Sequence, residues 1–135
     1  MSFELHPVLA RDTLPVVALG VSQLLLMNDA RFPWCILVPR VPGITEWHHL
    51  EEAEQATVMQ EITAVSSFLE HLPNVSKLNV GALGNRVPQL HIHVIGRHTE
   101  DPAWPDPVWG FGRAVPYAAR AADLRVRQLR AALIG

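Results

Sequence analysis

The sequence has little cysteine, little lysine and no long apolar segment. Cys35 is the single cysteine among 135 residues, which excludes an internal disulfide framework and a cysteine-rich zinc site. Lys77 is the only lysine, and a formal net charge of -2 excludes a general basic footprint for nucleic acid. No segment is long and apolar enough to span a membrane. The N-terminal residues, with Glu4 and Pro7, lack the features of a signal peptide, so we expect a cytoplasmic protein.

What the chain does contain is typical of a single globular domain. Hydrophobic residues make up 49% of the sequence and charged residues 18%. A chain of this length can bury roughly two-thirds of its unfolded surface. There is no internal repeat. We predict one domain over residues 1–135, with a core at about 3–110 and a C-terminal arm and helix at about 102–135.

Apolar runs and turn residues predict the order of the elements. Residues 15–19 and 23–27 flank Gly20, which indicates a hairpin, and residues 35–38 predict a third strand. Apolar residues recur every three or four positions from Leu50 to about Leu72, which predicts a helix with acidic residues in its first turn. Two further strands are expected, over residues 78–83 and 90–95.

The segment 102–116 combines four prolines and two glycines with large aromatic residues. Such composition alone suggests a linker, but Trp104, Trp109 and Phe111 require burial against a surface. We therefore expect an extended arm that packs on its own domain or on a partner subunit. Residues 118–133 are rich in Ala, Leu and Arg, which favours a terminal helix with a solvated basic face.

The most informative segment is Gln89-Leu-His-Ile-His-Val-Ile95. In a strand, alternate side chains point to opposite faces, so Leu90, Ile92 and Val94 would form one apolar face. Gln89, His91 and His93 would then line the other face, about 6.6 Å apart. Two adjacent imidazoles repel each other when protonated, so at least one is expected to stay neutral near pH 7.

Three interpretations of these histidines follow from the residues alone. They are structural strand histidines, or they form a metal site, or they catalyse a reaction as nucleophile or general acid and base. A metal site needs a third ligand, for which His48, His49, His98 or Asp101 are available. Catalysis is favoured by the neighbouring amides of Asn79 and Asn85, by Gly81 and Gly84, and by Arg97. These groups are suited to holding a phosphate oxyanion.

Taken together, these motifs resemble the histidine triad superfamily of nucleotide hydrolases and transferases, over roughly residues 3–110. The resemblance rests on the following segments: Asn28-Asp29, Ile36–Pro39, Trp47–Leu50 with the acidic helix after it, Asn79–Asn85, Gln89–Ile95 and Trp104–Gly110. It is most similar to a small bacterial branch with a Gln-x-His-x-His motif. The resemblance implies an α+β fold with an antiparallel sheet, one main helix and a C-terminal helix, paired into a homodimer.

The resemblance also implies a reaction. His91 would attack the α-phosphorus of a purine nucleoside phosphoryl substrate and form a nucleotidyl-histidine intermediate, which water would hydrolyse. His93 would bind phosphate oxygens and help the leaving group to depart. Asn79 and Asn85 fall at phosphate-contacting positions, and Asn28 and Asp29 at ribose-contacting positions. The base would lie in an apolar slot, for which the candidates are Leu5, Val8, Leu9 and Leu26. No cofactor is implied, although a divalent cation can accompany the substrate phosphates.

Two positions depart from the family pattern. Gln89 replaces the first histidine of the triad, and Cys35 stands where many members carry a further histidine. Glutamine can form hydrogen bonds but cannot change its charge near pH 7. We therefore expect a working or slow enzyme. The alternatives are a nucleotide-binding module without turnover and a metal-dependent hydrolase.

Overall fold

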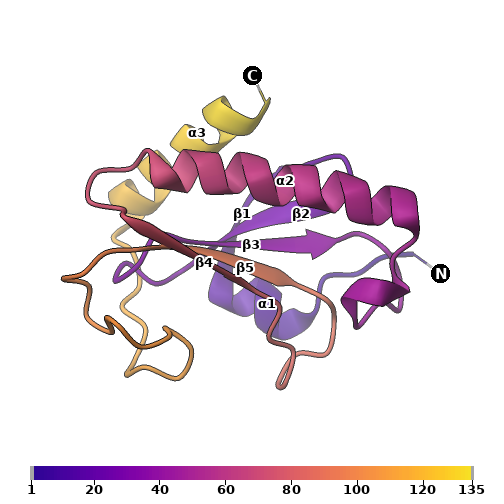
Figure 1. Cartoon of the computed structure of the whole chain (residues 1–135), viewed down its shortest axis with the longest axis horizontal. Coiled ribbons are helices and arrows are strands. Elements are labelled where there is room, and N and C mark those ends of the chain that lie inside the picture. Colours follow the sequence, from indigo (N-terminus) through magenta and orange to yellow (C-terminus); the bar gives the residue numbers. More distant parts are fainter. Residues whose placement is uncertain (1, 135) are drawn as a thin grey trace.

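The computed structural model describes residues 2–134, which form one antiparallel sheet with helices on both faces (Figure 1). The strands lie in the order β1-β2-β3-β5-β4, and every neighbouring pair is antiparallel. This confirms the α+β class. The elements in chain order are α1 (Pro7–Asp12), β1 (Thr13–Ala18), β2 (Ser22–Met27), β3 (Trp34–Pro39), the 3-10 helix η1 (Trp47–His49), α2 (Glu52–Glu70), β4 (Lys77–Gly81), β5 (Ile92–Arg97) and α3 (Ala119–Ile134).

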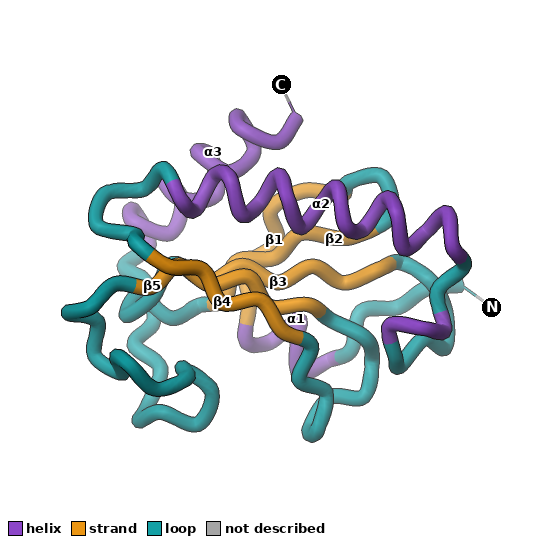
Figure 2. The backbone as a smooth tube through the Cα atoms, in the orientation of Figure 1, coloured by secondary structure: helices purple, strands orange, loops and turns teal. Residues whose placement is uncertain are grey.

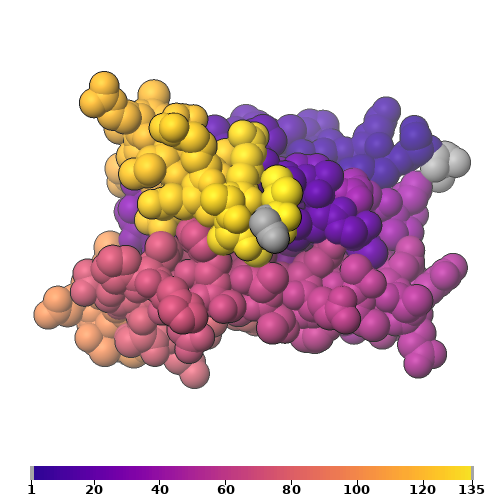
Figure 3. Space-filling model, turned by 90° about the horizontal axis from the view of Figure 1, so that it is seen from above, coloured from indigo at the N-terminus to yellow at the C-terminus, as the bar shows by residue number. Residues whose placement is uncertain are grey.

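The sheet separates two apolar clusters, one on each face. Cys35 and Leu37 of β3 face the cluster that contains Val58 and Val65 of α2. Trp34, Ile36 and Val38, at the alternate positions, belong to the second cluster. Figure 2 shows α2 and α3 on one side of the sheet, with α1 and the long loop after β5 on the other. Figure 3 views the first face from above, where α3 covers the sheet beside α2.

Helix α2 spans Glu52–Glu70 of the predicted stretch from Leu50 to about Leu72 and begins at a capping box. The backbone N–H of Glu51 donates to the side chain of Glu54 in a capping box. Acidic residues occupy the first turn, where the positive end of the helix dipole stabilises their negative charge. Its buried residues recur at helical spacing: Val58, Glu61, Ile62, Val65 and Leu69. The carboxylate of Glu61 accepts from the backbone N–H of Val21 at 2.8 Å and thereby ties the helix to the β1–β2 turn.

Strand boundaries and one helix differ from the expectation. β5 begins at Ile92, two residues later than predicted, because the N–H of Leu90 donates to the carbonyl of Ile44 outside the sheet. β4 ends at Gly81 instead of residue 83. Helix α1 was not predicted. It is too short for a helical repeat and is capped by the ring of His6, which accepts from the N–H of Val8.

The proline-rich arm packs on its own domain. Ala103 and Val108 are buried in the second cluster. Farther along, the backbone N–H groups of Val115 and Tyr117 donate to the side chains of Asp29 and Asn28. The segment is therefore a structural layer, and it brings residues 108–112 toward the histidine-bearing face of the sheet. Across the described part of the chain, no helix has the length and apolarity needed to cross a membrane.

Candidate active site

The two histidines lie side by side on the face of the sheet that is covered by α1 and the arm. Leu90, Ile92 and Val94 belong to the opposite, α2-facing cluster, so the predicted alternation is confirmed. The ring centroids of His91 and His93 are 4.9 Å apart. The rings are not freely exposed, because the residues retain only 5% and 4% of their accessible surface.

His91 is oriented by a backbone carbonyl. Its Nδ1 lies 2.7 Å from the carbonyl oxygen of Gln89. A carbonyl can only accept, so Nδ1 must carry the hydrogen, and Nε2 of the neutral ring keeps its lone pair. Burial lowers the pKa of His91, and the charge of His6 lowers it further, against the raising effect of the Gln89 carbonyl. At neutral pH His91 is therefore an uncharged imidazole with a nucleophilic Nε2.

His93 has the opposite arrangement of its ring nitrogens. The indole Nε1–H of Trp34 donates to Nδ1 of His93 at 2.9 Å. The ring of Trp109 meets His93 edge to face, with centroids 5.3 Å apart. Burial, with a smaller contribution from the charge of His91, lowers the pKa of His93 to about 3. Both histidines are thus neutral near pH 7, which agrees with the expectation from their spacing.

Gln89 does not extend the row of histidines as predicted. Its side-chain oxygen accepts from the N–H of His6 at 2.9 Å, and its side-chain nitrogen donates to the carbonyl of Glu4 at 2.8 Å. The side chain therefore binds the N-terminal segment, and only the backbone carbonyl contacts His91. Since any residue supplies such a carbonyl, the replacement of the first histidine leaves the orientation of His91 intact.

The histidines border a pocket of about 460 Å³. Its lining residues are Met27, Trp34, Leu83, Asn85, Arg86, Val87, His91, His93, Trp109 and Gly110. A second pocket of about 510 Å³ shares Met27, Trp34, Arg86 and Gly110 with the first and extends to Asn28 and Asp29. The two form one groove of a size that suits a small ligand.

Comparisons with known proteins identify the family of this chain. The model of the HIT domain family matches residues 13–100. The chain belongs to the HIT family. Its members generally bind nucleotides and act on nucleotide phosphates. None of the curated proteins searched matches the chain.

Three solved structures from bacteria are similar to this HIT domain over nearly their whole length. A histidine triad protein from Marinobacter aquaeolei VT8 is 43% identical, covers 99% of this chain and 98% of its own, and has a TM-score of 0.96. One from Bradyrhizobium japonicum is 41% identical, with coverages of 98% and 99% and a TM-score of 0.95. One from Sinorhizobium meliloti 1021 is 43% identical, with coverages of 97% and 97% and a TM-score of 0.94.

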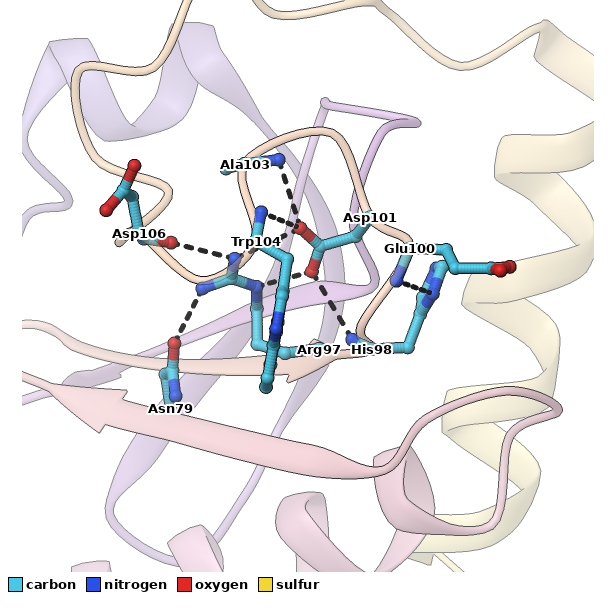
Figure 4. Close-up of polar contacts among 8 residues, drawn as sticks. All are labelled: Asn79, Arg97, His98, Glu100, Asp101, Ala103, Trp104 and Asp106. Carbon is cyan, nitrogen blue, oxygen red and sulfur yellow. Dashed lines mark hydrogen bonds and ion pairs between the residues drawn. The ribbon is translucent and has the colours of Figure 1, made fainter.

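The HIT domain brings only part of the expected phosphate-binding set to the pocket. Asn85 lines it together with the histidines. Asn79 does not. Its side-chain oxygen accepts from Nη1 of Arg97 at 2.8 Å, within a buried network that also contains Asp101 (Figure 4). Asn79 therefore acts on the base of the arm rather than on a ligand in the pocket.

Asn28 and Asp29 reach the groove, but their side-chain oxygens already have partners. The oxygen of Asn28 accepts from the N–H of Tyr117 at 2.9 Å. Asp29 forms an ion pair with Arg31 at 2.8 Å and is 1% exposed. Burial opposes ionisation of Asp29, but the hydrogen bonds from Arg31 and from backbone N–H groups outweigh it and lower the pKa of the carboxyl. In this structure both residues anchor the arm.

The expected apolar slot is not part of the groove. Leu26 is buried in the α2-facing cluster, while Leu5, Val8 and Leu9 pack around the second cluster, and none of the four lines either pocket. Cys35 is fully buried on the α2 side of β3, where burial raises the pKa of its thiol to about 12. The preceding β3 residue, Trp34, lies on the other face and donates a hydrogen bond to His93.

Three residues of the site were not expected from the sequence. Trp34 donates to His93, Trp109 covers its ring, and Arg86 borders both pockets. Gly81, opposite His93 in the β4–β5 register, permits the position of Trp109, because a Cβ there would lie 3.2 Å from the indole. Trp34 and Trp109 lie 59 residues before and 16 residues after His93 in the chain, so no local pattern connects them.

Proposed function

We propose that this HIT domain is a nucleotide hydrolase that acts at the α-phosphate of a nucleoside phosphoryl substrate, with a purine nucleotide as the preferred ligand. The hydrogen bond from Nδ1 of His91 to the Gln89 carbonyl carries the proposal. It holds the ring hydrogen on Nδ1, so Nε2 keeps a free lone pair in a ring that borders the pocket. Nε2 attacks phosphorus, the leaving group departs, and water hydrolyses the nucleotidyl-histidine. Asn85 and His93 line the same pocket and supply hydrogen bonds to phosphate oxygens.

The test is the release of adenosine monophosphate from an adenosine phosphoramidate and, separately, from a diadenosine polyphosphate. His91→Ala should lose the release at least about 1,000-fold, since the other neutral imidazole of the pocket, His93, has its Nδ1 bound to the indole of Trp34. The matched control is His71→Ala, an exposed histidine at the C-terminal end of α2. Acid quenching followed by peptide mass spectrometry should find the nucleotidyl group on His91.

The same experiment separates the alternative of a binding module. Nucleotide binding by calorimetry with no release of monophosphate from any substrate would contradict the proposed hydrolase and favour a domain that binds nucleotide without turnover. Release that persists in His91→Ala would contradict the assignment of the nucleophile. We place the activity in the cytoplasm, where nucleoside phosphates are available.

We propose no resident metal for this reaction, although a divalent cation can accompany the substrate phosphates. A metal site would need a third ligand beside the two histidines. Within residues 2–134, no group of three or more His, Cys, Asp or Glu side chains gathers in a metal-binding arrangement. Asp101, one of the candidates, is bound to Arg97. Activity that survives exhaustive chelation is expected, and its loss with recovery on added metal would contradict the proposal.

We also propose a homodimer, with β4 as the contact strand. β4 ends the sheet, so its outer edge offers unpaired backbone groups to a second copy of the chain. Val80 on this strand is 50% exposed. Sedimentation should give a dimer for the parent protein, and Val80→Glu should weaken it. A monomer at all concentrations would refute the pairing.

A further inference from the structure

The hydrogen bond between Trp34 and His93 fixes where the proton of His93 lies. An indole nitrogen can donate but cannot accept. Nδ1 of His93, which receives the bond at 2.9 Å, must therefore carry no hydrogen. In the neutral ring the hydrogen is then on Nε2. Protonation of the ring would put a second N–H at Nδ1, directly against the indole N–H, so Trp34 also disfavours the imidazolium form.

The remaining nitrogen of His93 is available to a ligand. The ring borders the pocket, and Nε2 has no hydrogen-bond partner among the described residues. Within residues 2–134, the buried side-chain polar atoms without a partner are Ser22 Oγ and Trp109 Nε1, so Nε2 of His93 is not enclosed. His93 therefore presents one N–H to the pocket.

None of the ionisable side chains that line the pocket is placed to protonate a leaving group at neutral pH. The ionisable residues that line it are His91, His93 and Arg86, and the described residues contribute no carboxyl, thiol, phenol or lysine to its walls. Positive charge on His91 or Arg86 opposes protonation of His93. In the adjoining pocket, Asp12 and Asp29 are each paired with an arginine. The site can therefore give hydrogen bonds but has no side chain ready to give up a proton.

We propose that Trp34 is a positioning residue that fixes His93 as a neutral Nε2–H donor, so that the site cleaves nucleoside phosphoryl substrates whose leaving group departs as a stable oxyanion, such as a phosphate chain or a carboxylate, in preference to an amine. This inference rests on the proposed function. An oxyanion of an acidic leaving group departs without a proton, whereas an amine must be protonated as its bond to phosphorus breaks.

The steps balance without a general acid. The lone pair of His91 Nε2 forms a bond to the α-phosphorus, and the bond from phosphorus to the leaving oxygen breaks, with its electron pair staying on that oxygen. Nδ1–H of His91 remains bonded to the Gln89 carbonyl, so the phosphorylated ring is cationic. Water then attacks phosphorus and releases a proton to solvent, and the electron pair of the P–N bond returns to Nε2.

The substrate test uses two matched probes that differ in one atom, the para-nitrophenyl ester and the para-nitroanilide of adenosine monophosphate. The parent protein should favour the ester by at least about 100-fold in kcat/KM, the size of a missing general acid. Trp34→Phe removes the indole N–H, so the ring hydrogen of His93 can move to Nδ1 and Nε2 is no longer held as a donor, while burial still keeps the ring neutral. This variant should lower kcat/KM for the ester about tenfold, because the leaving oxyanion loses a hydrogen-bond donor.

The matched control is Trp47→Phe, which removes an indole that packs on the α2-facing cluster away from the histidines. It should leave kcat/KM for the ester unchanged. An anilide that the parent cleaves as fast as the ester, or a kcat/KM for the ester that Trp34→Phe does not lower, would overturn the proposal.

The proton position is tested separately by nitrogen NMR of the histidine rings in the parent protein, which needs neither turnover nor a variant. His93 should show a protonated Nε2 and an unprotonated Nδ1 from pH 8 to pH 5, without titrating. A protonated Nδ1, or titration in this range, would overturn the proposal even if both probes were cleaved. The expected ring form with no cleavage of either probe would instead refute the proposed function, and the leaving-group assignment with it.

Discussion

The buried ion pair at the base of the arm gives a quantitative prediction about stability. The carboxylate of Asp101 accepts from Nε of Arg97 at 2.6 Å and from the backbone N–H groups of Ala103 and Trp104 at 3.0 and 2.8 Å. The side chains of Arg97 and Asp101 are each 2% exposed. Asp101→Ala would leave the guanidinium buried with no carboxylate, and the backbone N–H groups of His98 and Ala103 would lose their acceptor.

The expected loss follows from that geometry. Removing one partner of a buried pair costs about 3–5 kcal/mol, because the remaining charge stays desolvated. At an m-value of about 2 kcal/mol/M, this lowers the urea midpoint by about 2 M. The loss is a large part of the total for a domain whose free energy of unfolding is about 5–15 kcal/mol. Because the network ties the loop that carries Trp109, the contact of that ring with His93 should loosen as well.

Equilibrium urea unfolding, followed by far-UV circular dichroism, measures the effect. The matched control is Asp123→Ala, which breaks an i,i+4 pair with Arg127 whose side chains are 65% and 67% exposed. Such a surface pair contributes little, so its midpoint should stay essentially unchanged. If both variants unfold at the same urea concentration, the buried network does not hold the arm, and the reasoning is refuted.

Two further predictions concern the histidine strand. The pKa of His93 is about 3 in the folded protein, below its ordinary value, so on acidification this histidine takes up a proton in the unfolded chain first. The free energy of unfolding should therefore fall by about 2 kcal/mol between pH 7 and pH 5. Urea unfolding at the two pH values measures this loss. His93→Gln should flatten that slope, and an unchanged slope would show that His93 is not the group responsible. Gln89→Ala removes both bonds to the N-terminal segment and should speed amide exchange at His6, while kcat falls less than about tenfold because the backbone carbonyl remains. A loss as large as that of His91→Ala would mean that the Gln89 side chain acts in the chemistry.

Local pattern was sufficient to predict much of the fold and the position of the two histidines. The alternation in residues 90–94 placed His91 and His93 on one face, because the period of a strand is two whatever it pairs with. The helical spacing between Leu50 and Leu72 predicted α2, since its buried residues lie on a single stripe. These features depend on neighbours in the chain, and the sequence contains them directly.

The partners of the histidines depend on tertiary structure. Trp34 and Cys35 are adjacent, yet Trp34 contacts His93 and Cys35 is buried under α2. Because alternate residues of a strand face opposite sides, an error of one position in the alignment assigns the histidine contact to a residue on the wrong face of the sheet. Gln89 and Asn79 have the residue types of a phosphate site, but the path of the N-terminal segment and the ion pair of Arg97 take up their side chains.

The sequence by itself determined which side chains are candidates for the proposed chemistry, because residue type and strand period are local. Only the tertiary structure decided the protonation of those side chains. The carbonyl of Gln89 and the indole of Trp34 set the hydrogens of His91 and His93, and both contacts require a particular chain path and strand register. A hydrogen bond of about 3 Å is decided by the packing of segments distant in sequence, which a local pattern does not contain.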